Sequence, residues 1–325
     1  MAKTNNIKDF FQSLKKILYF KGVVDATTQI TPNNIPDKLS EIDKSKFGSF
    51  VENIICYISV GILGVKKLYI DCTTILYSAY TNCSNLEIVQ FSDKVISIQG
   101  EVFRGCKKLT TVIATPSLKS VGSLSFYECS NLINLENFDN VTSIGTDCFL
   151  DSAYISNHAD GPIYIGKVLY LYKGETPDIV TLDATNIVTI NYKAFDSKSL
   201  KKCEITGNKL VIQINAFLND TNLEEIYIYS DKSTGGVSFS ANSFNGCTAL
   251  KKVYVDEVSW ISNNSFDGSN IEEFYFLNNT TVPAATSLPG LSPFKNTAIF
   301  YVDKNLVDTW KEVLVDYNIQ PYNGG

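Results

Sequence analysis

Apolar and polar positions alternate along this chain in a motif that recurs at a nearly constant spacing. Each copy has an aromatic residue, two variable residues, a small residue, two more variable residues and a leucine, as in Phe103-Arg-Gly-Cys106-Lys-Lys-Leu109. The copies begin at Tyr80, Phe103, Phe126, Phe149, Phe195, Phe217, Phe244, Phe266 and Phe294. Because the step is 22 to 28 residues, or 46 where one copy is overwritten, the pattern predicts a solenoid whose coils bury their apolar faces against each other.

Each coil is expected to hold two short strands. The first lies before the aromatic residue, as in Val95-Ile-Ser-Ile98, and the second starts at the leucine, as in Leu250-Lys-Lys-Val253-Tyr-Val255. Alternation of apolar and polar residues in the second segment is typical of a half-buried strand. Irregular runs at 68–71 and 74–77 are the expected strands of the first coil.

One copy of the motif is missing between Phe149 and Phe195. In its place, at about 153–186, two tyrosine-rich apolar runs flank Gly166-Lys167 and predict a β-hairpin. The sequence leaves two arrangements open, a hairpin that protrudes from the solenoid and one that replaces a coil.

The N-terminal residues 1–45 lack the repeat and predict a small helical hairpin. Its first helix would be amphipathic, with an apolar face formed by Phe10, Phe11, Leu14, Ile17 and Leu18. Such a short hairpin has no core of its own, so its apolar face is expected to dock on the first coil, on a second copy in a homo-oligomer, or on another protein.

The C-terminal residues 303–325 predict a capping helix and a tail that close the solenoid of residues 46–302. Phe300–Val302 is the expected last strand, and the helix over 306–314 would start at a cap formed by Asp303 or Asn305. A helix there would cover the open edge of the last strand.

Composition excludes several classes of protein. The net charge is −6 and no basic run occurs, which argues against nucleic acid as a partner. No apolar run approaches the length that a membrane span requires. The first ten residues lack the apolar segment of a signal peptide, so the expectation is a chain that stays in the cytosol or leaves it by another route.

The eight cysteines are expected to be reduced core residues. Cys83, Cys106, Cys129 and Cys247 occupy one position of the motif, which other copies fill with Ser152, Lys198, Asp220 or Ser269. A position that alternates in this way is typical of packing in a tight turn, where free cysteine behaves as a small apolar residue. No C-x-x-C pair occurs, so neither a zinc site nor any other cofactor is predicted.

Catalytic chemistry is not indicated. The single histidine, His158, lies in a polar loop, and an exposed loop histidine is a more common interpretation than a catalytic one. Paired charges at Lys201-Lys202, Glu224-Glu225, Lys251-Lys252 and Glu272-Glu273 alternate in sign on successive strands. They predict cross-strand ion pairs that set the register.

The candidate ligand-binding residues form a row of aromatic side chains. Aligning the second strands places Tyr227, Tyr254, Tyr275 and Tyr301 at one outward position on neighbouring coils. Tyrosine combines an apolar ring with a polar tip, which suits interfaces and sugar rings. Tyrosine is also favoured on any exposed strand, so a purely structural row is the competing interpretation.

The motif resembles the BspA-like, or TpLRR, branch of the leucine-rich repeats over residues 46–318. Ile190-Asn-Tyr-Lys-Ala-Phe195 matches the first half of its consensus and Cys247-Thr-Ala-Leu250-Lys-Lys-Val253-Tyr-Val255 the second. The resemblance implies a β-rich, right-handed solenoid that serves attachment or protein binding and is not an enzyme.

The segment from Ile17 through Lys21-Gly22 to Ile35 is similar to a short segment of phage tail and virion proteins. On this resemblance the leading hypothesis is a structural or attachment protein of a bacteriophage virion. Its N-terminal module would dock on a virion or tail protein, and its solenoid would bind a host surface protein or glycan. The alternative is a BspA-like adhesin at the bacterial cell surface.

Overall fold

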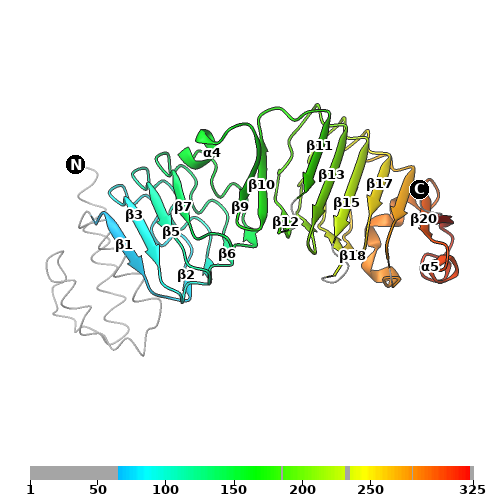
Figure 1. The fold of residues 1–325 in the computed structure, drawn as a ribbon, viewed down its shortest axis with the longest axis horizontal. Helices are drawn as coiled ribbons and strands as arrows, with labels where there is room; N and C mark the ends of the chain where they lie inside the picture. The colour runs from blue at the N-terminus through cyan, green and yellow to red at the C-terminus, as the bar shows by residue number, and fades with distance from the viewer. Residues whose placement is uncertain (1–64, 184–185, 231–234, 280, 323–325) are drawn as a thin grey trace, which may run out of the picture.

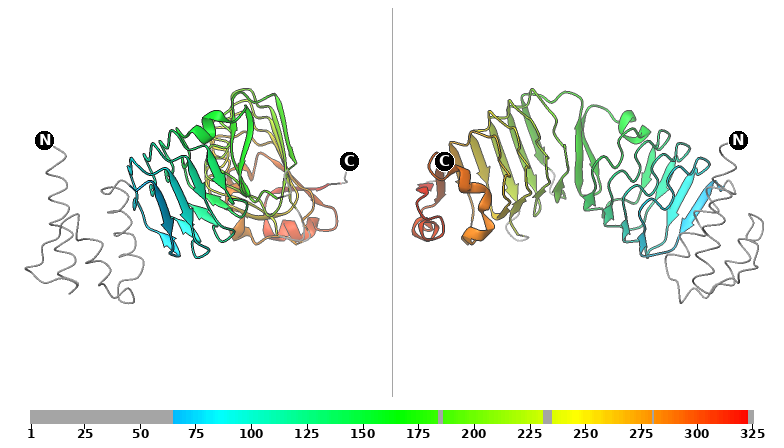
Figure 2. Two further views of the ribbon diagram at one scale, coloured as in Figure 1. Left: turned by 60° about the vertical axis from the view of Figure 1, so that its left-hand side comes forward. Right: turned by 180° about the vertical axis from the view of Figure 1, so that it is seen from behind.

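The computed structural model of the protein describes residues 65–183, 186–230, 235–279 and 281–322. Over these residues the chain winds into an elongated, curved stack of coils, with β1 (Lys67–Ile70) and α5 (Val307–Val313) at opposite ends (Figures 1 and 2). The prediction of a β-rich solenoid is confirmed. The predicted N-terminal helices, with Phe10, Phe11, Leu14, Ile17 and Leu18, lie outside the described residues.

The coils of the N-terminal half form two parallel four-stranded sheets, one on each side of the stack. The first contains β1 (Lys67–Ile70), β3 (Ile88–Phe91), β5 (Thr111–Ile113) and β7 (Asn134–Glu136). The second contains β2 (Thr74–Ile75), β4 (Ser97–Ile98), β6 (Ser120–Val121) and β8 (Ser143–Ile144). Each coil thus contributes one strand to each sheet, as the motif predicts.

The C-terminal half repeats this arrangement with longer sheets. The seven-stranded sheet, in order, contains β11 (Ile179–Asp183), β13 (Lys202–Gly207), β15 (Glu225–Ser230), β17 (Lys252–Val255), β19 (Glu273–Phe276), β20 (Ile299–Asp303) and β21 (Asn318–Tyr322). The six-stranded sheet contains β18 (Val258–Ile261), β16 (Val237–Phe239), β14 (Val211–Ile212), β12 (Thr189–Ile190), β10 (Val168–Lys173) and β9 (Gly161–Ile165).

The aromatic residues of the motif stack on one another through the core. Ring centroids lie 5.1–5.3 Å apart from Tyr80 to Phe149 and 4.6–5.1 Å apart from Phe195 to Phe266, with nearly parallel planes. Each such pair contributes about 0.5–1.5 kcal/mol beyond the area that it buries. Phe294, the start of the last predicted copy, lies instead in the 3₁₀ helix η2 (Pro289–Phe294), which follows η1 (Ala285–Ser287).

The cysteines of the motif tie neighbouring coils together. The thiols of Cys106, Cys129 and Cys247 each donate to the backbone carbonyl of the aromatic residue one coil earlier, with Sγ to O distances of 3.0–3.2 Å. All seven cysteines that the structure describes are free and buried, as predicted; Cys56 lies outside the described residues.

The hairpin predicted around Gly166 replaces a coil. β9 and β10 pair antiparallel, and β10 pairs in parallel with β12, so the hairpin starts the six-stranded sheet. Tyr170 meets Phe149 edge to face at 5.6 Å, and Tyr172 stacks on Phe195 at 6.0 Å. The short helix α4 (Ala153–Asn157), which the sequence pattern does not predict, precedes the hairpin. The hairpin therefore joins two aromatic stacks and two cores.

The C-terminal end differs from the prediction in two respects. The predicted last strand, at 300–302, is followed by β21, which pairs in parallel with β20 beyond the helix α5 (Val307–Val313). The N-cap residue of the helix is Leu306, which has no capping side chain, and Asp303 Oδ1 instead accepts the backbone N–H of Asn305 in the preceding turn. Pro321 in β21 removes one N–H donor from the outermost strand, which discourages edge-to-edge pairing.

Candidate binding surface

The four tyrosines of the predicted row lie at one register position on four neighbouring strands. Tyr227 pairs with Tyr254, Tyr254 with Tyr275, and Tyr275 with Tyr301. Their strands, β15, β17, β19 and β20, lie side by side in this order (Figure 1). Their side chains alternate with buried apolar residues and are all half-buried. The parallel pairing of successive coils places them there, because it brings the same motif position of each coil to the same register position.

The rings of this row lie face to face. Successive centroids are 4.1, 4.3 and 4.5 Å apart, with interplanar angles of 3°, 11° and 11°. The outer face of Tyr227 is covered by Lys202, whose Nζ lies 4.4 Å from the ring centroid. The ring faces therefore cover one another, and the row presents ring edges and hydroxyl groups to the outside.

Acidic neighbours orient the hydroxyl groups. Tyr227 donates to Glu225 at 3.1 Å and Tyr275 to Glu273 at 2.8 Å, each within its own strand. Burial raises the pKa of Tyr275 above its ordinary value, and the hydrogen bond to Glu273 raises it further. The phenol therefore stays protonated at neutral pH and serves as a donor.

The predicted ion pairs between strands form in part. Lys251 pairs with Glu272 at 2.9 Å and Lys252 with Glu273 at 3.1 Å. Lys202, however, pairs at 2.7 Å with Glu204 of its own strand, although Glu225 is its register partner. Ion pairs thus connect β17 with β19, and lysine and glutamate side chains lie beside the tyrosine row.

Two further aromatic residues extend the row, and the sequence reasoning missed both. Tyr229 lies two positions along β15, with its ring centroid 6.4 Å from that of Tyr227. Tyr322 meets Tyr275 edge to face at 5.7 Å. The i+2 spacing on one strand could have revealed Tyr229, whereas Tyr322 depends on the unpredicted strand β21.

The repeat matches a described family. The BspA type leucine rich repeat region matches residues 73–159 and 170–287, in six copies. The chain belongs to this family. BspA-type repeats are a protein-binding fold, and proteins that carry them are typically surface or binding proteins.

Solved structures of leucine-rich repeat proteins are similar to this BspA-type chain. One from Bacteroides ovatus is 18% identical, with a TM-score of 0.38, over 79% of this chain and 66% of that one. A leucine rich cell surface protein from Faecalibacterium prausnitzii is 18% identical, with a TM-score of 0.31, over 80% of each chain. The T. pallidum leucine-rich repeat protein is 18% identical, with a TM-score of 0.25, over 61% of this chain and 70% of that one. No protein with a curated description matches the chain.

His158 is the other residue that the sequence of this BspA-type chain offers for chemistry. His158 is half-buried at the C-terminal end of α4, where its Nδ1 lies 2.5 Å from the carbonyl oxygen of Tyr154, so the expected exposed loop histidine is wrong. Among the described residues no group of three or more histidine, cysteine or acidic side chains is placed to hold a metal ion. No helix in the described ranges has the length and apolarity needed to cross a membrane.

Proposed function

We propose that this BspA-type protein is a non-enzymatic adhesin of the bacterial cell surface that binds a host protein through the tyrosine row. The observation that carries the proposal is the face-to-face stack of Tyr227, Tyr254, Tyr275 and Tyr301 on adjacent strands. The surface character that is typical of the family supports the location.

The geometry favours a protein over a glycan as the partner. A sugar ring packs on an open aromatic face, and here the faces are occupied by neighbouring tyrosines and by Lys202. Ring edges, hydroxyl groups and bordering charges match the aromatic and polar composition of protein interfaces. Because the stack already fixes the side-chain rotamers, binding forfeits little conformational entropy.

The test is the adhesion of beads that carry the full chain to epithelial cell layers. Tyr254→Thr interrupts the row and introduces a β-branched residue, which also favours a strand. We expect it to reduce adhesion at least 10-fold, and pretreatment of the cells with protease to do the same. Ile113→Thr is the matched control, because Ile113 is also half-buried, on β5, at the equivalent place in its coil.

Two outcomes would overturn the proposal. Adhesion of Tyr254→Thr equal to that of the unmodified chain would remove the row from the binding surface. Adhesion that is lost after glycosidase treatment of the cells but survives protease would assign the partner to a glycan. A thermal melt of each variant establishes that it folds.

The virion hypothesis rests on the first 44 residues, which lie outside the described part of the chain, and no comparison supports it. It stays a prediction with its own test, the incorporation into particles of a chain that lacks residues 1–44. Normal incorporation of the truncated chain would contradict a docking role for Phe10, Phe11, Leu14, Ile17 and Leu18.

A further inference from the structure

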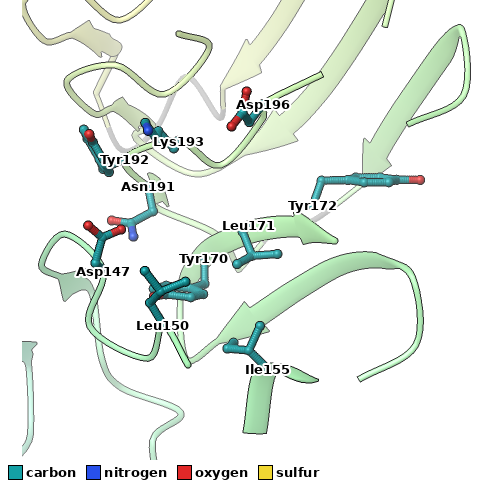
Figure 3. Close-up of a pocket in the computed structure, with 10 residues that line it drawn as sticks. All are labelled: Asp147, Leu150, Ile155, Tyr170, Leu171, Tyr172, Asn191, Tyr192, Lys193 and Asp196. Carbon is teal, nitrogen blue, oxygen red and sulfur yellow. The ribbon is translucent and has the colours of Figure 1, made fainter. Parts of the chain in front are cut away.

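A pocket of about 230 Å³ opens where the hairpin replaces a coil (Figure 3). Its apolar lining comes from Leu150, Ile155, Tyr170 and Leu171. Polar side chains also line it, namely Asp147 from the last coil of the N-terminal half and Asn191, Tyr192, Lys193 and Asp196 from the first coil beyond the hairpin. The pocket thus lies between two coils that are separated by one missing repeat.

The missing coil leaves a backbone donor at the pocket. In the preceding coils the N–H groups of Ser78, Glu101 and Leu124 each donate to a carbonyl of the next coil at 2.9–3.0 Å. Asp147 occupies the same position of the motif, two residues before the aromatic residue. Its N–H makes no hydrogen bond in the part of the chain that the structure describes, because the next turn is absent.

The side chain of Asn191 stands on the other side of the pocket. Asn191 is 2% exposed, and its backbone groups bond to Leu169 and Ala194. Its side-chain amide has no hydrogen-bond partner among the described residues. Gln99, at the same position of an earlier coil, uses its side chain to accept the N–H of Tyr77 in the coil before it, at 3.0 Å. β10, which pairs with the strand just before Asn191, makes no such hydrogen bond with the Asn191 side chain.

Because Asn191 lines the pocket, its amide is open to a ligand or to water that completes its hydrogen bonds. The side chains of Asn191 and Asp147 extend from the two coils into the same part of the pocket (Figure 3). Together they offer an amide donor, an amide acceptor, a carboxylate and a free backbone N–H above an apolar floor. This combination suits a ligand that has hydroxyl groups on its rim and C–H groups on its face.

We propose that the pocket binds one neutral sugar ring, a monosaccharide or the terminal residue of a glycan. Its volume is below the roughly 300–1,000 Å³ of pockets for drug-sized ligands, so a single ring is the appropriate size. Two acidic side chains, Asp147 and Asp196, line the pocket, against one basic side chain, Lys193. The Nζ of Lys193 lies 5.6 Å from the ring centroid of Tyr192. This balance disfavours anionic sugars.

The experiment is ligand-observed NMR with the full chain and D-glucose, D-galactose, D-mannose or N-acetyl-D-glucosamine. N-acetylneuraminic acid serves as the anionic comparison. We expect at least one neutral sugar to bind more tightly than the anionic one. Asn191→Leu should weaken that binding at least 10-fold without lowering the melting temperature, because the amide has no partner within the protein.

Asp147→Asn is the second variant, because asparagine tolerates the positive φ of 52° at this position. Gln213→Leu is the matched control, since Gln213 fills the position of Asn191 one coil later and does not line the pocket. Absence of binding by every neutral sugar would overturn the proposal, as would binding that neither Asn191→Leu nor Asp147→Asn weakens. The proposal does not rest on the tyrosine row, so Tyr254→Thr should leave the sugar signal unchanged.

Discussion

The backbone N–H of Phe149 donates a 3.0 Å hydrogen bond to the side-chain hydroxyl of Tyr170. In the two preceding coils the aromatic N–H donates instead to a backbone carbonyl, from Phe103 to Ser125 and from Phe126 to Cys148, at 2.8 Å. A side chain of the hairpin thus takes the place of the missing coil in the hydrogen bonds between coils. This contact helps to join the two halves of the solenoid, beside the hydrogen bond from the Lys167 N–H to the Val141 carbonyl at 2.8 Å.

Tyr170→Phe should therefore destabilise the protein. The substitution keeps the ring beside Phe149 but removes the acceptor of a buried N–H, which costs about 1–3 kcal/mol. Tyr172→Phe is the control, because the hydroxyl of Tyr172 makes no hydrogen bond within the described chain, and its cost should stay below about 0.5 kcal/mol. Urea denaturation measures both, and equal stabilities of the two variants would contradict the role of Tyr170.

Asp220 should make stability depend on pH. Its side chain is fully buried at the cysteine position of the motif, where Oδ1 accepts the N–H of Ser197 at 2.6 Å and Oδ2 has no partner among the described residues. Burial raises the pKa of this carboxyl to about 7, and Asp196 adds to the rise. The unfolded value is about 4.

Between these two pKa values the native state holds the proton more tightly than the unfolded state. The contribution of Asp220 to stability is therefore complete below about pH 4 and is lost as the pH rises to about 7. Asp220→Asn should remove this loss and add about 2–4 kcal/mol at pH 8. Urea denaturation at several pH values is the measurement, with the exposed Asp139→Asn as control. An unchanged slope of stability against pH would refute the assignment.

The position two residues before each aromatic residue should favour asparagine. The backbone there is left-handed in successive coils, with φ of 58° at Leu124 and 55° at Asn215. Asparagine tolerates this conformation far better than leucine. Leu124→Asn should stabilise the protein by about 0.5–1 kcal/mol, and Asn215→Leu should destabilise it by a similar amount. Both side chains are half-buried, so denaturation of the pair isolates the backbone effect; shifts of the same sign would contradict it.

The thiols should react slowly in the folded chain. Burial raises the pKa of Cys129 to about 12 and also raises the pKa of Cys148, so little reactive thiolate forms at pH 8. Seven of the eight cysteines are buried and free, and Cys56 lies outside the described residues. A thiol reagent should therefore modify at most one cysteine quickly in the native protein and all eight in urea. Rapid modification of several thiols without urea would refute the buried assignment.

The sequence alone determined the repeat and the place that its phase assigns to each residue. The motif gives each residue the same position in its coil even where the step varies, so the cysteines fell in the core and Tyr227, Tyr254, Tyr275 and Tyr301 fell in one row. These conclusions need only the period and the alternation of apolar residues, which are local properties of the chain.

Only the tertiary structure decided how the side chains of different coils meet. The spacing does not determine that the tyrosine faces cover one another, because ring rotamers depend on contacts across strands. The strand at 318–322 was missed because it carries no copy of the motif and pairs only after α5 has folded over the end coil. The pocket beside Asn191 could not be predicted either, because it lies where the hairpin stands in place of a regular turn of the motif. The sequence pattern does not show which hydrogen-bonding groups this replacement leaves without a partner.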